Sequence, residues 1–242
     1  MDFAIIGFPK CGTTALIQEL SKYREYNILK DEGAKIEYNV ARFHPNIQEH
    51  IGSNLKGDAL NGHKFVAYAF SKSAVRNLLR YNQNMKMILC VRTPLKALIS
   101  WHNMHKRIAN SKDPSNHFAY KERNFYGSCN LLSYYYNYAK ERLRYDIYLE
   151  RVFELVPENN LMLVYQEEMA KSTSNTLLAV ADFLGTDIRD AISKEEHPSS
   201  RHVGFADKGS HEIPNLIVEE LNDVYQRVLS FDKRNNIPNN RW

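Results

Sequence analysis

Residue types that bind phosphate gather near the start of the chain, in Gly7-Phe8-Pro9-Lys10-Cys11-Gly12-Thr13-Thr14. An apolar run over 3–7 precedes this segment, and residues 13–22 have a helical composition. Backbone N–H groups in a loop between a strand and a helix, together with the N-terminus of that helix, attract anions. Glycine lets the backbone turn tightly and approach a phosphate closely. The segment therefore predicts a phosphate-binding loop.

The position of the lysine distinguishes this loop from the Walker A loop of ATP- and GTP-hydrolysing enzymes. Gly7 and Gly12 have the Walker spacing, but a Walker loop ends in Gly-Lys-Ser/Thr, whereas Thr13 follows Gly12 here. A Walker lysine reaches the β- and γ-phosphates beside Mg²⁺. The earlier lysine, Lys10, indicates a different leaving group and no metal ion.

A second group of residues with possible chemistry follows a predicted buried strand over 85–91. Arg92-Thr93-Pro94 comes directly after this strand, and Ser100 lies about two helical turns beyond Arg92. A guanidinium group presents a fork of donors that matches phosphate oxygens. Arg92 is therefore suited to phosphate oxygens, although a lone arginine at a strand end is also a common surface cation.

Together the two patterns resemble those of the sulfotransferases that use 3′-phosphoadenosine 5′-phosphosulfate (PAPS). The first motif of that family reads Pro-Lys-any-Gly-Thr-Thr, and the second reads Arg-any-Pro followed by a serine on the next helix. The resemblance implies that the donor is PAPS, that the product is 3′-phosphoadenosine 5′-phosphate (PAP), and that Arg92 and Ser100 hold the 3′-phosphate. It assigns the 5′-phosphosulfate to Lys10, Cys11, Gly12, Thr13 and Thr14.

Further positions are similar to the heparan-sulfate and glucosaminyl branch of this family. Lys64 precedes Ala67-Tyr68 as in a Lys-any-any-Ala-Tyr segment of that branch, and Lys208-Gly209 lies where the family closes over the nucleotide. The chain departs from the branch at His63, where a carboxylate is usual, and it lacks the C-terminal disulfide loop. A polysaccharide acceptor therefore does not follow from the resemblance.

Sulfuryl transfer to a hydroxyl needs cations at the leaving oxygen and a base for the hydroxyl proton. Lys10 is the candidate for the bridging oxygen, and Lys64 for the sulfuryl oxygens or the leaving phosphate. The resemblance suggests Glu32 as the general base, because it follows the first helix at the spacing of that branch. The alternatives that stay open are Glu37, His63 and His102.

Strand and helix patterns alternate along the chain, which favours an α/β fold, a P-loop-type parallel sheet with helices on both faces. A length of 242 residues suits one domain over 1–242. Strands are predicted over 3–7, 65–70, 85–91 and 161–165. Helices are predicted over 13–22, 71–81, 131–156, 173–184 and 216–231, with another that begins at Pro94, and loops over 110–130 and 199–214.

The composition limits the partners. A net charge of +4 suits a small polyanion better than a nucleic acid, and no apolar run is long enough to span a membrane. Cys11, Cys90 and Cys129 form no disulfide framework, which predicts a reducing compartment such as the cytoplasm. His197 and His202 are too ordinary a pair to indicate a metal site, so we expect none.

Two other functions fit part of this pattern. A Mg²⁺-dependent P-loop nucleotide kinase would share the sheet but would need the Walker lysine that this loop lacks. A nucleotide-binding module without catalysis would keep Lys10, Arg92 and Ser100 but would tolerate the loss of every candidate base. The sequence favours the sulfotransferase, with an acceptor hydroxyl on a carbohydrate or a small molecule.

Overall fold

The computed structural model describes residues 1–29, 55–109, 132–193, 213–235 and 237–241. Within them lies a five-stranded sheet with the order β2-β3-β1-β4-β5, in which each neighbouring pair is parallel. The central strands β1 and β4 are almost wholly buried, as expected for parallel strands covered on both faces. The strands are β1 Phe3–Gly7, β2 Tyr26–Ile28, β3 Leu60–Lys64, β4 Lys86–Val91 and β5 Leu161–Tyr165.

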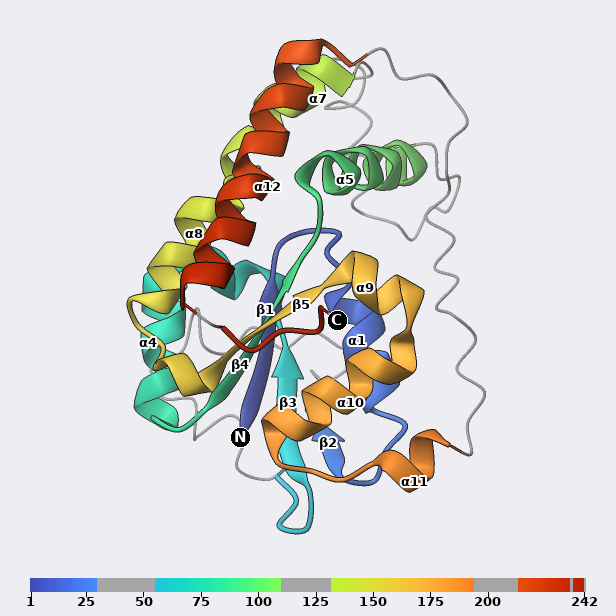
Figure 1. The fold of residues 1–242 in the computed structure, drawn as a ribbon, viewed down its shortest axis with the longest axis vertical. Helices are drawn as coiled ribbons and strands as arrows, with labels where there is room; N and C mark the ends of the chain where they lie inside the picture. Colours follow the sequence, from blue (N-terminus) through green and yellow to red (C-terminus); the bar gives the residue numbers. More distant parts are fainter. Residues whose placement is uncertain (30–54, 110–131, 194–212, 236, 242) are drawn as a thin grey trace.

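Helices cover both faces of the sheet, which confirms the predicted α/β architecture (Figure 1). One group, α4, α8 and α12, lies on one side, and α1, α9 and α10 lie on the other, while α5 crosses beyond the carboxyl end of β4. These helices are α1 Thr13–Leu20, α4 Lys72–Tyr81, α5 Pro94–Ala109, α8 Tyr145–Phe153, α9 Gln166–Lys171, α10 Thr173–Leu184 and α12 Asn215–Asn235. The shorter elements are η2 Val66–Phe70, α7 Leu132–Ala139, η3 Lys140–Leu143, η4 Glu158–Asn160 and α11 Arg189–Ile192.

Several predicted helix ends are confirmed with their capping residues. The hydroxyl of Ser71 accepts a hydrogen bond from the backbone N–H of Ala74 and so caps α4. Helix α10 ends at Gly185, whose φ of 75° closes the helix in the left-handed conformation. Pro94 is the first residue of α5, where its missing N–H costs nothing.

The predicted strand over 65–70 is wrong. The strand is β3, immediately before it, and the apolar residues form the 3₁₀ helix η2 instead. Within β3, Gly62 pairs with Phe3 of β1, and a Cβ atom at Gly62 would overlap the phenyl ring. Strand β3 is buried although its sequence is polar. The apolar residues of η2 bury Tyr68 and do not form a strand.

The single helix predicted over 131–156 is also wrong, because the chain breaks between α7 and α8. Arg144 leaves the helical region with ψ of 60° and donates two hydrogen bonds to Asp146, at 3.1 and 3.2 Å. Asp146 also accepts from Arg227 of α12 at 2.6 Å. The break allows Tyr145 to stack on Phe8, with the ring centroids 4.0 Å apart. The contacts with Arg227 and Phe8 come from distant parts of the sequence, so helical composition alone could not predict the break.

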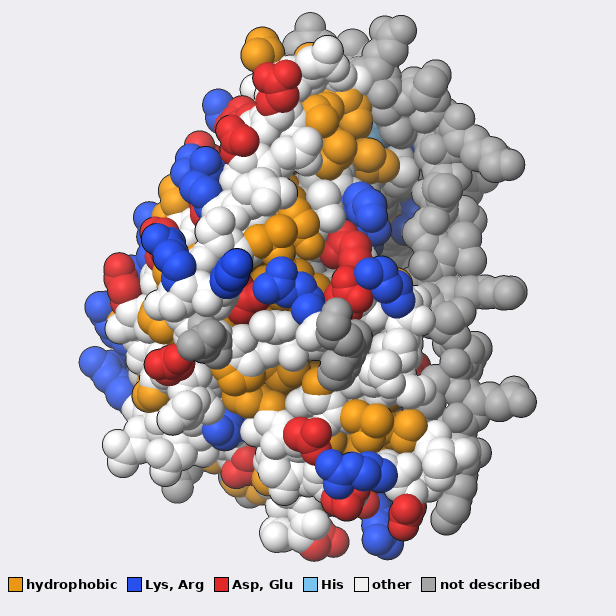
Figure 2. Space-filling view, viewed as in Figure 1, with side chains coloured by type: hydrophobic (Ala, Val, Ile, Leu, Met, Phe, Trp, Pro, Cys, Tyr) orange, Lys and Arg blue, Asp and Glu red, His pale blue; other side chains and the backbone are white. Residues whose placement is uncertain are grey.

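The surface and the helices bear on the expected partners. On the face drawn in Figure 2, lysines and arginines are interspersed with acidic side chains, which matches the small net charge. Within the described residues, no helix is both long and apolar enough to cross a membrane. The predicted loop over 110–130, and 199–212 of the predicted loop over 199–214, lie outside the described residues.

Candidate active site

The predicted phosphate loop joins β1 to α1 at the carboxyl edge of the sheet. Lys10, with φ of 67°, and Gly12, with φ of 89°, both have left-handed backbones, so the loop curls before α1 begins. A lysine in this conformation costs roughly 1–2 kcal/mol, and such strain is typical of functional loops. No side chain caps α1 at Gly12, so no side-chain cap occupies the N–H groups of the first helical turn, which face the loop. A concave run of backbone amides of this kind can bind an anion.

A buried cluster of two aromatic rings and a thiol, from Phe8, Tyr145 and Cys11, packs against the loop. Phe8 stacks on Tyr145, and the thiol of Cys11 lies 3.5 Å from the Tyr145 hydroxyl. Burial raises the pKa of the Cys11 thiol to about 12, so the side chain stays protonated at neutral pH. The Cys11 side chain therefore packs in the core, and only its backbone remains available to a nucleotide.

Three cationic side chains from three elements meet at the loop. Lys64, at the end of β3, is 1% exposed, and its amine donates to the Thr14 hydroxyl at 3.0 Å. Arg92, after β4, donates to the Lys10 carbonyl oxygen at 3.2 Å. The third cation is Lys10 itself, whose amine lies 3.7 Å from the sulfur of Met104 on α5. The fold thus brings together Lys10, Thr14, Lys64 and Arg92, four of the residues that the sequence analysis named as site candidates.

The electrostatics of this cluster favour an anion. Burial, followed by the nearby positive charges of Arg107, Arg92 and Lys64, lowers the pKa of the Lys10 amine. In addition, Nε of Arg92 is buried and has no hydrogen-bond partner among the described residues. A phosphate would relieve the repulsion and accept from Nε. The residues present therefore fit the nucleotide that the sequence motifs imply.

Helix α5 carries Ser100, the serine of the second predicted motif, on the side that contacts the same loop. Ser100 and Met104 are one helical turn apart, so both lie on the face of α5 that touches Lys10. Arg107 continues this stripe three residues later and acts on Lys10 electrostatically. Ser100 is half-buried, and its placement agrees with a role beside Arg92.

The two histidines considered as bases occupy buried positions. Side chains alternate along β3, so His63 points away from the Lys64 face, and its ring lies against Tyr68. Burial lowers the pKa of His63 to about 4. His102 is 1% exposed and packs edge-on against Tyr135, on another face of α5 from Ser100. Both are poorly placed to meet an acceptor at the loop.

Other predicted residues lie outside the described part of the chain. They are Glu32, Glu37, Lys208 and Gly209, as well as Cys129, His197 and His202. Within the described residues, no group of three or more His, Cys, Asp and Glu side chains is arranged to hold a metal ion.

Sequence reasoning did not name Glu167, an acidic residue beside the candidate site. It lies on α9, directly after the predicted strand 161–165, and it accepts hydrogen bonds from Thr93 at the start of α5. The signal available was its position, because polar residues just past the carboxyl ends of parallel strands commonly line the binding edge.

Residues 1–236 match the family model described as "Sulfotransferase domain". The chain belongs to the sulfotransferase family. This match confirms the family resemblance seen in the two phosphate-binding motifs, without singling out the heparan-sulfate branch. No curated protein was found to match this sulfotransferase in sequence.

Solved sulfotransferase structures share the fold. One, from Alicyclobacillus acidocaldarius, is 19% identical, with a TM-score of 0.55 over 81% of this chain and 86% of that one. The sulfotransferase domain of the Synechococcus PCC 7002 olefin synthase is 13% identical, with a TM-score of 0.53 over 79% and 75%. Mouse sulfotransferase SULT7A1, complexed with PAP, is 18% identical, with a TM-score of 0.50 over 82% and 63%. At these identities the likeness concerns the fold.

Proposed function

We propose that this sulfotransferase takes its sulfuryl group from PAPS and transfers it to an acceptor hydroxyl, releasing PAP. The observation that carries the proposal is the convergence of Lys10, Lys64 and Arg92 on one strained loop, with Nε of Arg92 buried and unpartnered. A similar structure, mouse SULT7A1, is complexed with PAP, which supports the choice of nucleotide. A reducing compartment such as the cytoplasm remains a prediction from the cysteines.

Each cation has a separate role in this proposal. Lys10 stabilises the charge that develops on the bridging oxygen of the leaving group, and Lys64, held by Thr14, neutralises the neighbouring oxygens. Arg92 and Ser100 bind the 3′-phosphate, and Lys208 with Gly209 closes over the nucleotide. When bound, PAPS supplies the sulfuryl group, and the chain's part is to orient it and to bind the leaving phosphate. Side chains carry this charge, so no metal ion is required.

The function is tested by comparing two nucleotides that differ in the 3′-phosphate. Calorimetry should show PAP binding at least about tenfold more tightly than AMP, because a charged hydrogen-bonded contact is worth that much or more. Arg92→Ala should remove most of this preference, whereas Arg80→Ala, at an exposed position on α4, should keep it. Equal affinities of the wild type for PAP and AMP would refute the assignment.

The general base is proposed to be Glu32, with Glu37 as the alternative, because the two histidines are buried away from the loop. In an assay with labelled PAPS and a panel of acceptors, Glu32→Gln should lower turnover about a hundredfold, the scale of general-base loss. Glu37→Gln serves as the matched comparison and should have little effect. Turnover should survive EDTA, whereas a requirement for Mg²⁺ would favour the nucleotide kinase.

A further inference from the structure

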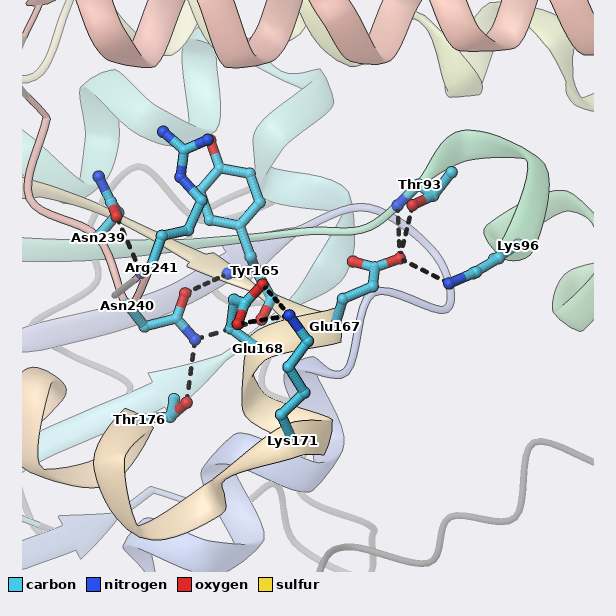
Figure 3. A network of polar contacts seen from close by, with 10 residues as sticks. All are labelled: Thr93, Lys96, Tyr165, Glu167, Glu168, Lys171, Thr176, Asn239, Asn240 and Arg241. Atoms are coloured by element: carbon cyan, nitrogen blue, oxygen red, sulfur yellow. Dashed lines mark hydrogen bonds and ion pairs between the residues drawn. The ribbon is translucent and has the colours of Figure 1, made fainter.

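One carboxylate ties α9 to the turn that carries Arg92. Oε1 of Glu167 accepts two hydrogen bonds from Thr93, one from the backbone N–H at 3.0 Å and one from the hydroxyl at 2.7 Å. Figure 3 shows both bonds, with Lys96 approaching the same oxygen from α5 at 4.0 Å. The two partners are 74 residues apart in the sequence, so this contact exists only in the folded chain.

Thr93 is a residue whose orientation matters to the proposed nucleotide site. It stands between Arg92 and Pro94, and its carbonyl oxygen accepts from the N–H of Ala97 in the first turn of α5. Fixing Thr93 therefore fixes both the exit of β4 and the start of α5. The first sets the direction of the Arg92 side chain, and the second sets the position of Ser100.

The same short helix also supports the phosphate loop. A Cβ atom at Gly12 would lie 2.7 Å from the terminal methyl of Met169 and 3.1 Å from Cγ of Gln166, so α9 packs directly on the loop. Helix α9 thus touches both halves of the nucleotide site. Its packing holds the loop that faces the 5′-phosphosulfate, and its carboxylate holds the turn that faces the 3′-phosphate.

We propose that Glu167 is a positioning residue that gives this sulfotransferase its preference for a 3′-phosphorylated nucleotide, through Thr93. This inference rests on the proposed function, in which Arg92 and Ser100 hold the 3′-phosphate. A carboxylate near a phosphate site opposes binding by its charge alone, while the N-terminus of α5 and Lys96 favour the carboxylate where it is. If Glu167 acts by positioning Thr93, its loss should weaken PAP binding. If only its negative charge matters, its loss should strengthen PAP binding.

Two substitutions separate positioning from charge. Glu167→Ala and Glu167→Gln remove the same charge, but the glutamine amide oxygen can still accept from both Thr93 donors. Glu167→Ala should weaken PAP binding about tenfold and AMP binding less than about twofold, since only the 3′-phosphate contacts are displaced. Glu167→Gln should stay within about threefold of the wild type for both nucleotides.

The neighbouring residue is the matched control. Glu168 pairs with Lys171 on the outside of the same helix (Figure 3), so Glu168→Ala should leave both affinities unchanged. Equal effects of Glu167→Ala and Glu167→Gln, tighter PAP binding by either, or parallel losses of PAP and AMP would each overturn the proposal. A wild type without PAP preference would instead refute the proposed function itself.

A second variant covers the case in which Glu167→Ala does not fold. Thr93→Val removes the hydroxyl that donates to Glu167 and also bonds Tyr225 of α12, and keeps the shape and the backbone donor. It should reduce the ratio of AMP to PAP dissociation constants about threefold or more, because one of the two bonds to the carboxylate is lost. A folded Thr93→Val protein with the wild-type ratio would overturn the proposal.

Discussion

At the scale of single residues, the site is organised by buried positive charge. The amine of Lys64 is almost fully buried, and the repulsion of neighbouring cations adds to burial in lowering the pKa of Lys10. Holding cations close together in the protein interior costs free energy. An anionic nucleotide would add favourable interactions with them, so its binding should stabilise the folded protein.

His63 makes a pH-dependent contribution to stability that can be measured. Its ordinary pKa of 6.5 applies in the unfolded chain, whereas burial lowers its pKa in the folded protein to about 4. Between these values the unfolded state binds more protons, so the free energy of unfolding decreases as the pH falls from 6.5 to 4. Over this range the wild type should lose on the order of 2–3 kcal/mol more than His63→Leu does.

Urea unfolding of both proteins at several pH values between 7 and 4 measures this difference. Acidic residues titrate in the same range, but they contribute equally to both proteins and cancel in the comparison. Parallel pH profiles would show that the pKa of His63 is the same in the folded and unfolded states.

At the scale of elements, the short helix α9 has more influence on the site than its six residues suggest. It packs on Gly12 of the phosphate loop, and it holds the start of α5 through Glu167. Neither contact depends on the intrinsic stability of so short a helix, which would not form alone. The site is therefore assembled by packing between elements rather than by one continuous motif.

The contact between α9 and the loop predicts different outcomes for two glycines with left-handed backbones. Gly12→Ala adds a methyl at an unfavourable φ of 89°, where it would displace the flexible end of Met169 and crowd Cγ of Gln166 at 3.1 Å, so it should lower the free energy of unfolding by about 2 kcal/mol and weaken PAP binding. Gly185→Ala, where a Cβ meets nothing within 4 Å, should cost only about 1 kcal/mol, from the backbone alone.

Urea unfolding and calorimetry with PAP measure the two effects. The Gly185 variant should bind PAP like the wild type, because the neighbouring Thr186 bonds Tyr26 at the start of β2, at the end of the parallel sheet opposite the loop. Undiminished PAP affinity in the Gly12 variant would mean that the loop tolerates displacement by α9.

At the scale of the whole molecule, the C-terminal segment seals the last strand of the sheet. The Leu163 N–H donates to the Pro238 carbonyl at 2.8 Å, and Leu163 and Asn239 form a parallel bridge. Arg241 lies over the ring of Tyr165, 4.8 Å from its centroid, and pairs with the buried Asp232 at 2.7 Å. Because β5 leads directly into α9, this segment stabilises the strand from which the site is supported (Figure 3).

Asn240 lies at the centre of the contacts between this C-terminal segment and β5. It is fully buried, accepts from the Tyr165 N–H at 2.8 Å, and donates to the Tyr165 carbonyl and the Thr176 hydroxyl. Asn240→Ala would leave these groups unsatisfied and should lower the free energy of unfolding by about 2–4 kcal/mol. Asn84→Ala, at an exposed position, should change it by less than about 0.5 kcal/mol. Equal urea midpoints for the two variants would contradict this account.

The sequence by itself determined the loop between β1 and α1, the strands β1, β4 and β5, and the placement of Arg92 after β4. These features are local, because a buried parallel strand is a short apolar run and the loop that follows it is marked by glycine or proline. Lys64 was also found, although through a family pattern and not through its strand, which was misplaced by several residues.

Only the tertiary structure decided the features that depend on distant partners. The polar strand β3 exists because Gly62 admits the ring of Phe3, and the break at Arg144 exists because Asp146 also binds Arg227. The role inferred for Glu167 requires Thr93, 74 residues away. The sequence pattern indicates whether a residue is buried. Packing between segments that are far apart in the chain decides which segment covers it.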